Sequence, residues 1–433
     1  MHGPLTRLTD HPRAALTLGL VGYSTRALAA AVAECGFQAV ALDAFCDADT
    51  RQVARCTTIE HWPEQILSVA ARVNCDAWLL AGGLENHGRI VQGLASRAAV
   101  LGPTRSQLRQ LRRLNHLAEL VVGIDGLAFP ETARDRRRFA DRPHLFKPFR
   151  SAGGLAVRHA WPASSTREAD TQGRGYWQAW VPGRVLGITC IVREEKGGQP
   201  FVSWCGATES LQADDWPGPQ PYAYRGSLGP VDLTPEQQQA AIALAGRIGS
   251  RLKYRGWLQA DFIESPDGRL WLLEFNPRWT AGMELLQACL PRDRKPLIAH
   301  LNSWGIAVPQ RTPTDTSPHQ LPPGTMDGAL ASAAGYRMAK AIFYADRACS
   351  LSGELLQRLP QFQQRQRWQA DLWWDIADIP EPAGPGQCLP VSAGQPLLTL
   401  RCGSDTGKPY PRGVWLEALR EARTAIAVLL NWA

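Results

Sequence analysis

The sequence contains no uninterrupted apolar run of the length that crosses a membrane. The first residues also lack an apolar segment of signal-peptide length before Gly22. These absences exclude the usual membrane and secretory patterns. We therefore expect a cytoplasmic protein that makes no membrane contact.

Cysteine is present, but it follows no pattern. The ten cysteines include no Cys-x-x-Cys pair and no Cys/His cluster. A chain of 433 residues can build a core without cross-links, so a disulfide framework is not needed. We expect reduced thiols and no zinc site.

Lysine is scarce and arginine supplies most of the positive charge, with a formal net charge of +7. Such a balance favours anionic small molecules, such as nucleotides or polycarboxylates. The two arginine-rich segments, Arg105–Arg113 and Arg134–Phe139, have no interleaved aromatic residues to stack on bases. We interpret both segments as solvated faces and expect no nucleic-acid partner.

The N-terminal region alternates strands and helices. The segment ALTLGLVGYSTRALAAAVAECGFQAVALDAF predicts a buried strand, a helix ended by Gly36, and a second strand that ends near Asp43. A third strand, Asp76–Gly83, and a helix after Gly88 continue the alternation. Residues 1–105 are therefore predicted to form a small open parallel α/β domain.

Three further regions follow, and length alone also suggests about three domains. Shorter strands and loops are predicted over residues 106–305, which hold the strongest motifs. Residues 306–330 are rich in Pro, Thr and Ser and predict a linker. Residues 331–433 predict a small β-rich module with a closing amphipathic helix.

The sharpest signal is the segment LQADFIESPDGRLWLLEFNPRW, in which two apolar strands flank turn residues. If Asp261 pairs with Glu274 across this hairpin, the two carboxylates share one face, and Asn276 joins them by the strand period of two. Three such oxygen ligands suit Mg²⁺. Without further context, a hairpin with its polar side in water is the commoner explanation. Arg278, two residues beyond Asn276, favours a phosphoryl site instead.

The second signal is HLFKPFRSAGG, where Lys147 at a strand end precedes a Gly-rich loop. A lysine charge and the backbone N–H groups of such a loop can hold phosphates. The third signal is the strand GYWQAWVPGR, stopped by Pro182 and Gly183. Its backbone would present a donor and an acceptor to an adenine edge, with Trp180 packed nearby. Each segment alone has a plain structural explanation, and their order along the chain is the stronger signal.

In this order the motifs resemble the ATP-grasp superfamily of ligases, over roughly residues 19–290. The resemblance implies an α/β ATP-grasp fold, with an N-terminal parallel α/β domain, a two-lobed α+β ATP-binding domain and, here, a small β-rich C-terminal module. It also implies that ATP and Mg²⁺, or Mn²⁺ in its place, take part in the reaction. A homodimer is a candidate assembly.

The resemblance implies site residues position by position. Lys147 and Arg278 would be catalytic, Lys147 on the ATP phosphates and Arg278 on the acyl phosphate. The closing loop over the nucleotide would be Ser151, Ala152, Gly153 and Gly154. The adenine site would be formed by Gln178, the backbone of Ala179 and Val181, and Trp180. The metal ligands would be Asp261, Glu274 and Asn276.

Two differences from the superfamily are visible. A frequent early ATP-binding lysine is absent from RRLNHLAELV, and Gln178 stands where Glu is common. A narrower resemblance, in VGYSTRALAAAVAECGFQAVALDAFCDADT, LLAGGLENHGRIV and LEFNPRWTAGMELL, is to an ATP-grasp subgroup of methylotrophic bacteria linked to the biosynthesis of tetrahydromethanopterin and methylofuran. That resemblance implies a step such as the addition of glutamate to a cofactor precursor.

The main hypothesis is an ATP-dependent carboxylate-amine ligase that acts on two small-molecule substrates through an acyl phosphate. One alternative is a carboxylase-like enzyme that phosphorylates bicarbonate. Another is a nucleotide-binding partner subunit with no turnover of its own.

Overall fold

The computed structural model describes residues 16–150, 152–160, 174–195, 197–309, 335–369, 371–381 and 387–432. The first elements are those that the sequence predicts: β1 (Thr17–Gly22), α2 (Arg26–Glu34) and β2 (Gln38–Asp43). The helix ends before Gly36, whose φ of +80° is the left-handed conformation that stops many helices. The predicted strand–helix–strand unit is therefore confirmed.

The N-terminal sheet has five parallel strands in the order β3-β2-β1-β4-β5. One face packs on α2 and on two later helices, α9 and α10, and the other face packs on α4 and α5. Burial on both faces explains why β1 and β4 are almost wholly apolar. The other elements of this region are α3 (Ala48–Val53), β3 (Arg55–Thr58), α4 (Ile66–Ala70), β4 (Ala77–Leu80), α5 (Gly88–Ala95) and β5 (Ala99–Val100).

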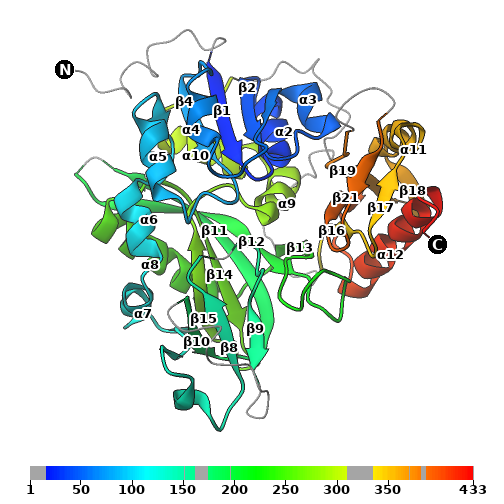
Figure 1. Ribbon diagram of the computed structural model, residues 1–433. Coiled ribbons are helices and arrows are strands. Elements are labelled where there is room, and N and C mark those ends of the chain that lie inside the picture. The colour runs from blue at the N-terminus through cyan, green and yellow to red at the C-terminus, as the bar shows by residue number, and fades with distance from the viewer. Residues whose placement is uncertain are drawn as a thin grey trace.

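A ten-stranded sheet runs through the rest of the molecule in the order β18-β19-β21-β16-β13-β12-β11-β14-β15-β6. Figure 1 shows the N-terminal sheet above the central strands β11, β12 and β14 of this sheet. Helix α8 covers one face around a core that includes Ile188, Leu244 and Phe262. Its central elements are β6 (Leu127–Ala128), β11 (Arg184–Glu194), β12 (Pro200–Ser210), β13 (Gly226–Val231), α8 (Pro235–Leu252), β14 (Gly256–Glu264), β15 (Leu270–Asn276), α9 (Ala281–Cys289) and α10 (Pro296–Ser303).

A separate four-stranded sheet, in the order β7-β10-β8-β9, lies at the opposite end of the molecule from the N-terminal sheet (Figure 1). Its small core is aromatic and consists of Phe139, Phe146 and Trp177. Helices α6 and α7 lead from the N-terminal sheet toward it. The elements of this stretch are α6 (Arg105–Leu111), α7 (Leu114–Val121), β7 (Thr132–Ala133), β8 (His144–Pro148), β9 (Arg158–Ala160) and β10 (Gly175–Ala179).

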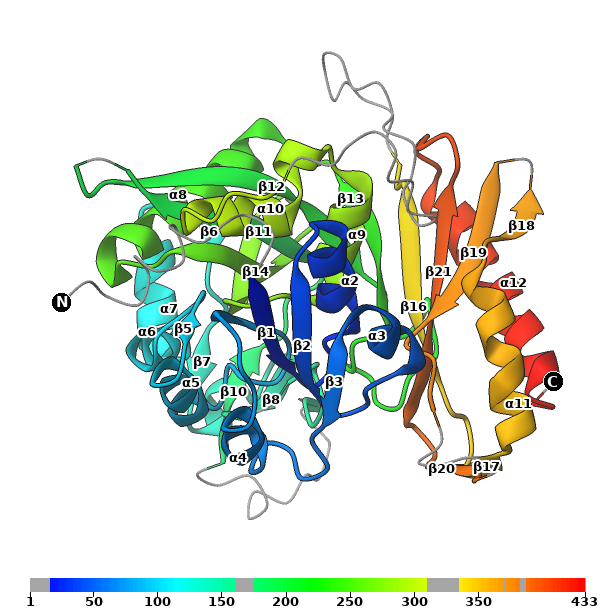
Figure 2. The ribbon, with the colours of Figure 1, turned by 90° about the horizontal axis from the view of Figure 1, so that it is seen from above.

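The predicted C-terminal β-rich module is present, and most of its strands continue the large sheet. Strand β16 pairs with β13 in antiparallel fashion, and β21, β19 and β18 follow. Figure 2 shows this extension beside the N-terminal sheet. Its elements are β16 (Met338–Tyr344), β17 (Cys349–Leu351), α11 (Gly353–Arg358), β18 (Gln366–Gln369), β19 (Leu372–Ala377), β20 (Leu389–Val391), β21 (Pro396–Ser404) and α12 (Arg412–Leu429).

The long helices are amphipathic. In α8 the side chains of Ala241, Leu244 and Ile248 are buried at helical spacing, and in α12 those of Trp415 and Leu419 are buried. No helix in the described part of the chain is long and apolar enough to cross a membrane.

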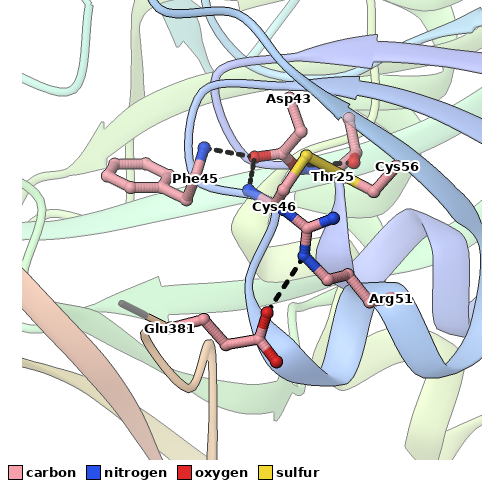
Figure 3. The surroundings of a disulfide bond; sticks show 7 residues. All are labelled: Thr25, Asp43, Phe45, Cys46, Arg51, Cys56 and Glu381. Carbon is pink, nitrogen blue, oxygen red and sulfur yellow. Dashed lines mark hydrogen bonds and ion pairs between the residues drawn. A yellow bond between two sulfur atoms is a disulfide. The ribbon is translucent and has the colours of Figure 1, made fainter. Parts of the chain in front are cut away.

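One expectation about cysteine is wrong, because Cys46 and Cys56 form a disulfide (Figure 3). The side chain of Asp43 accepts the N–H groups of Phe45 and Cys46 at 2.7 and 3.0 Å and so closes a turn after β2. That turn brings Cys46 beside β3, with 5.8 Å between the two Cα atoms. The contact depends on the pairing of β2 with β3, which a spacing of ten residues does not reveal.

Candidate active site

The hairpin formed by β14 and β15 has the predicted register. Asp261 pairs with Glu274, and Asn276 pairs with Gln259 on the same ladder. The turn closes through a hydrogen bond from the Ser265 N–H to the Arg269 carbonyl, at 3.0 Å. The two carboxylates therefore lie side by side, as the sequence predicts.

Asp261 is the most strongly perturbed of these groups. Its side chain accepts hydrogen bonds from the amides of Asn276, at 2.7 Å, and Gln259, at 2.8 Å. Burial and the neighbouring charge of Glu274 nevertheless raise the pKa of Asp261 to about 7. The repulsion between the two carboxylates therefore outweighs the nearby positive charge at Asp261, and a bound cation would relieve it.

The donor set fits Mg²⁺, which takes a few carboxylate or amide oxygens from a protein and completes its octahedron with water and phosphate. Two carboxylates and one amide meet here. The described residues contain no group of three His, Cys, Asp or Glu side chains that could hold a metal ion. The assignment of Asp261, Glu274 and Asn276 as ligands stays a prediction.

Arg278 lies next to this set, and four hydrogen bonds to neighbouring residues hold its guanidinium. Its guanidinium contacts the Glu85 carboxylate through two hydrogen bonds of 2.8 and 3.0 Å, and it also donates to Asn276 Oδ1 at 3.1 Å. A further bond reaches the Trp279 carbonyl at 3.1 Å. The hydrogen bonds described here use four of its five N–H groups and leave one on Nη1 for a ligand. The Nε–Nη2 edge of the guanidinium faces Glu85. An oxyanion would therefore bind through the remaining Nη1 N–H and the positive charge of the group.

Glu85 is a site residue that sequence reasoning missed. Burial disfavours its charge, but the charge and hydrogen bonds of Arg278 more than offset this and lower the pKa of Glu85 to about 2. It stands in LLAGGLENHGRIV, five residues after the end of β4 at Leu80. A carboxylate after the carboxyl end of a parallel strand was the available signal.

Arg112 corrects a second expectation. The segment Arg105–Arg113 was interpreted as a solvated face, but Arg112 donates to Glu274 Oε2 at 3.2 Å and to Asn86 Oδ1 at 2.6 Å. Arg112 is the first residue after α6, so its side chain does not follow the exposed face of that helix. Arg105 and Arg109 are exposed, as expected.

Lys147 on β8 belongs to the opposite, four-stranded sheet. Burial lowers the pKa of its ammonium group, and the charges of Glu274 and Asp261 act in the other direction. Lys147 is therefore close enough to both carboxylates for their negative charge to act on its pKa.

The loop after Lys147 is described from Ala152 onward, and Ser151 lies outside the described residues. Gly153 and Gly154 have φ of +60° and +72°, which favour glycine. A Cβ on Gly154 would stand 1.7 Å from the carbonyl oxygen of Tyr222. The Tyr224 N–H donates to the Gly153 carbonyl at 2.9 Å. The glycines therefore allow the loop to fold flat against Tyr222–Tyr224.

The strand β10 places Gln178 in the interior, with 1% of its surface exposed. Its amide nitrogen has no hydrogen-bond partner among the described residues, which is a costly arrangement for a buried donor. A ligand acceptor at this point would satisfy it, so the site fits a nucleotide. The N–H of Ala179 already donates to the Glu131 carbonyl at 2.9 Å, and that of Trp180 to the Pro143 carbonyl at 3.0 Å. Among the described backbone hydrogen bonds outside helices and strands, Val181 has none.

Comparisons with known proteins concern the family and the overall fold. A family model described as the ATP-grasp domain matches residues 120–282, which contain every predicted site residue. No curated protein matches the chain in sequence.

Solved structures match along nearly the whole chain. An N5-carboxyaminoimidazole ribonucleotide synthetase in complex with ADP has a TM-score of 0.61 at 15% identity, over 96% of this chain and 98% of that one. The enzyme of the same name from Thermus thermophilus has a TM-score of 0.58 at 18% identity, over 95% and 98%. The biotin carboxylase domain of the Hydrogenobacter thermophilus 2-oxoglutarate carboxylase has a TM-score of 0.60 at 14% identity, over 97% and 94%. The chain therefore has the ATP-grasp fold, including the C-terminal extension of its sheet.

Proposed function

We propose that this chain, with its ATP-grasp fold, is an ATP- and Mg²⁺-dependent ligase that activates a carboxylate as an acyl phosphate and couples it to an amine. The observation that carries the proposal is the meeting of Asp261, Glu274 and Asn276 with Arg278 at one end of the hairpin, opposite Lys147. Simple nucleotide binding would not need a buried arginine beside the carboxylates.

Each residue has a distinct task in this proposal. The side-chain amide of Gln178 would donate a hydrogen bond to the adenine in its buried position, and Lys147 would hold phosphate oxygens. Mg²⁺, held by the three hairpin oxygens, would neutralise the phosphate charge. Arg278, oriented by Glu85, would stabilise the acyl phosphate until the amine displaces phosphate from it.

The substrates we propose are small, and the narrower sequence resemblance points to an amino acid such as glutamate as one of them. The reaction would then extend a precursor of methylofuran or tetrahydromethanopterin. Support for this part comes only from the sequence segments VGYSTRALAAAVAECGFQAVALDAFCDADT, LLAGGLENHGRIV and LEFNPRWTAGMELL.

A second candidate is the phosphorylation of bicarbonate, because a structural match over 97% of the chain is a biotin carboxylase domain solved with bicarbonate. The third candidate, a partner subunit that binds ATP without turnover, is favoured by the absence of an early lysine in RRLNHLAELV.

The deciding experiment is substrate profiling by ADP release from the full chain with Mg²⁺. One arm pairs glutamate with furan or pterin amines and acids, and a second arm supplies bicarbonate alone. ADP release that requires both a carboxylate and an amine supports the ligase. Release with bicarbonate alone supports the second candidate. ATP binding without release in any arm contradicts both and leaves a binding subunit.

A further inference from the structure

Three aromatic side chains gather at the carboxyl edge of the N-terminal sheet, and none of the roles assigned above uses them. Tyr23 follows β1, Phe45 follows β2, and Trp62 lies beyond β3. The Tyr23 ring stands at 90° to Phe45, with centroids 5.1 Å apart, and at 87° to Trp62, with centroids 5.6 Å apart. Tyr23 is 48% exposed. Ligands of open parallel sheets bind at this edge.

The aromatic cluster lies directly beside the candidate active site. A Cβ on Gly83 would stand 3.1 Å from the Trp62 ring and 3.4 Å from the Tyr23 Cβ, whereas a Cβ on Gly82 would stand 3.7 Å from Arg278 Nη1. Two consecutive residues, with Cα atoms about 3.8 Å apart, therefore contact the aromatic rings on one side and Arg278 on the other.

The backbone at Tyr23 and Phe45 is held by hydrogen bonds, and the three rings pack edge to face. The Tyr23 N–H donates to the Gly82 carbonyl at 2.7 Å, and Phe45 is fixed by its N–H bond to Asp43, beside the disulfide of Cys46 (Figure 3). A preorganised aromatic surface loses little entropy when it binds a flat ligand.

We propose that Tyr23, Phe45 and Trp62 bind a planar aromatic ring carried by one of the two substrates, with its reactive group directed past Gly82 toward Arg278. The proposal rests on the proposed function for the role of Arg278. The ring-binding step itself needs neither ATP nor turnover. Aromatic pairing beyond simple apolar contact predicts a preference of about 3- to 10-fold for an aromatic ring over a saturated ring of similar size.

The test measures binding to the full chain without ATP, by titration calorimetry or ligand-observed NMR. One arm compares benzylamine with cyclohexylmethylamine, and the other compares benzoate with cyclohexanecarboxylate. We expect the aromatic preference in one arm, which identifies the substrate that carries the ring. Tyr23→Leu and Trp62→Leu should each remove it. Phe201→Leu, at another exposed aromatic on β12, should leave it unchanged.

Equal affinity for aromatic and saturated rings in both arms would overturn the proposal, as would a preference that survives in both cluster variants. Two variants are used so that one altered fold does not decide the result. Ring binding without any ADP release would refute the ligase and leave this inference standing. ADP release without a preference for aromatic rings would support the ligase and refute this inference.

Discussion

At the scale of single residues, the candidate site combines buried charges with the partly exposed carboxylate of Glu274. Asp261 and Glu274 repel each other, whereas Glu85 and Arg278 satisfy each other. A bound cation would relieve the repulsion in the first pair, and the second pair holds an arginine beside it. Loss of a carboxylate from the first pair should therefore affect turnover and its Mg²⁺ dependence, whereas loss of Glu85 should affect stability.

Glu274→Gln should lower ADP release by about 10²-fold or more and weaken its dependence on Mg²⁺, because one ligand charge is lost where phosphate charge must be neutralised. The matched control is Glu264→Gln on the same hairpin. Glu264 contacts Arg184 and accepts from Gln237 at 2.7 Å, away from the metal set. It should shift the melting temperature without changing the Mg²⁺ titration. Equal Mg²⁺ effects in both variants would exclude the metal assignment.

Glu85→Gln should reduce stability at neutral pH, because it leaves buried Arg278 without its counter-charge. The pKa of Glu85 falls from 4.5 to about 2 on folding. This shift corresponds to about 3 kcal/mol, which is fully present above pH 4.5 and is lost as the pH falls toward 2. Urea unfolding of both proteins should thus show a difference that shrinks over this window. A constant difference from pH 7 to pH 3 would contradict the role of this carboxylate charge.

At the scale of elements, the sequence predicts local structure well and long-range contacts poorly. The unit from β1 to β2 and the hairpin of β14 and β15 follow from apolar periodicity and turn residues, which act within one segment. The pairs Arg112–Glu274 and Arg278–Glu85 join residues 162 and 193 positions apart. Such contacts depend on how whole sheets pack, and no local pattern encodes them.

Gly154→Ala should displace the loop after Lys147, because its Cβ has no room against the Tyr222 carbonyl. We expect a several-fold higher ATP requirement for ADP release. Gly153→Ala is the control: its φ is also positive, but nothing lies within 4 Å of the added Cβ. It should cost only about 1 to 2 kcal/mol of backbone strain. Indistinguishable ATP titrations for the two variants would show that the close approach to Tyr222 has no part in nucleotide binding.

At the scale of the whole molecule, a buried ion cluster joins the three regions of the chain. Glu284 on α9 binds Lys340 on β16, at 2.6 Å, and Arg26 on α2 through two hydrogen bonds. Arg26 also donates to Asp378 at 3.0 Å, just beyond β19. The N-terminal sheet, the ATP-grasp hairpin region and the C-terminal strands are thus connected through one carboxylate.

Glu284→Gln should destabilise the protein strongly, because Arg26, Lys340 and Arg401 would share fewer negative partners in the interior. Burial opposes the charge of Glu284, yet these cations hold its pKa well below the ordinary value. Breaking such a buried set costs about 3 to 5 kcal/mol.

The control for this change is the ion pair of Arg51 and Glu381, which also joins the N-terminal region to the C-terminal strands. Its side chains are 45% and 44% exposed, with 3.0 Å between Nε and Oε2. Glu381→Gln should cost less than about 1 kcal/mol, because water screens an exposed pair. Urea unfolding followed by tryptophan fluorescence at pH 7 compares the two variants. If the free energy of unfolding falls by the same small amount in both variants, the buried Glu284 cluster stabilises the protein no more than an exposed ion pair. The three regions would then be held together by the shared sheet and its apolar core.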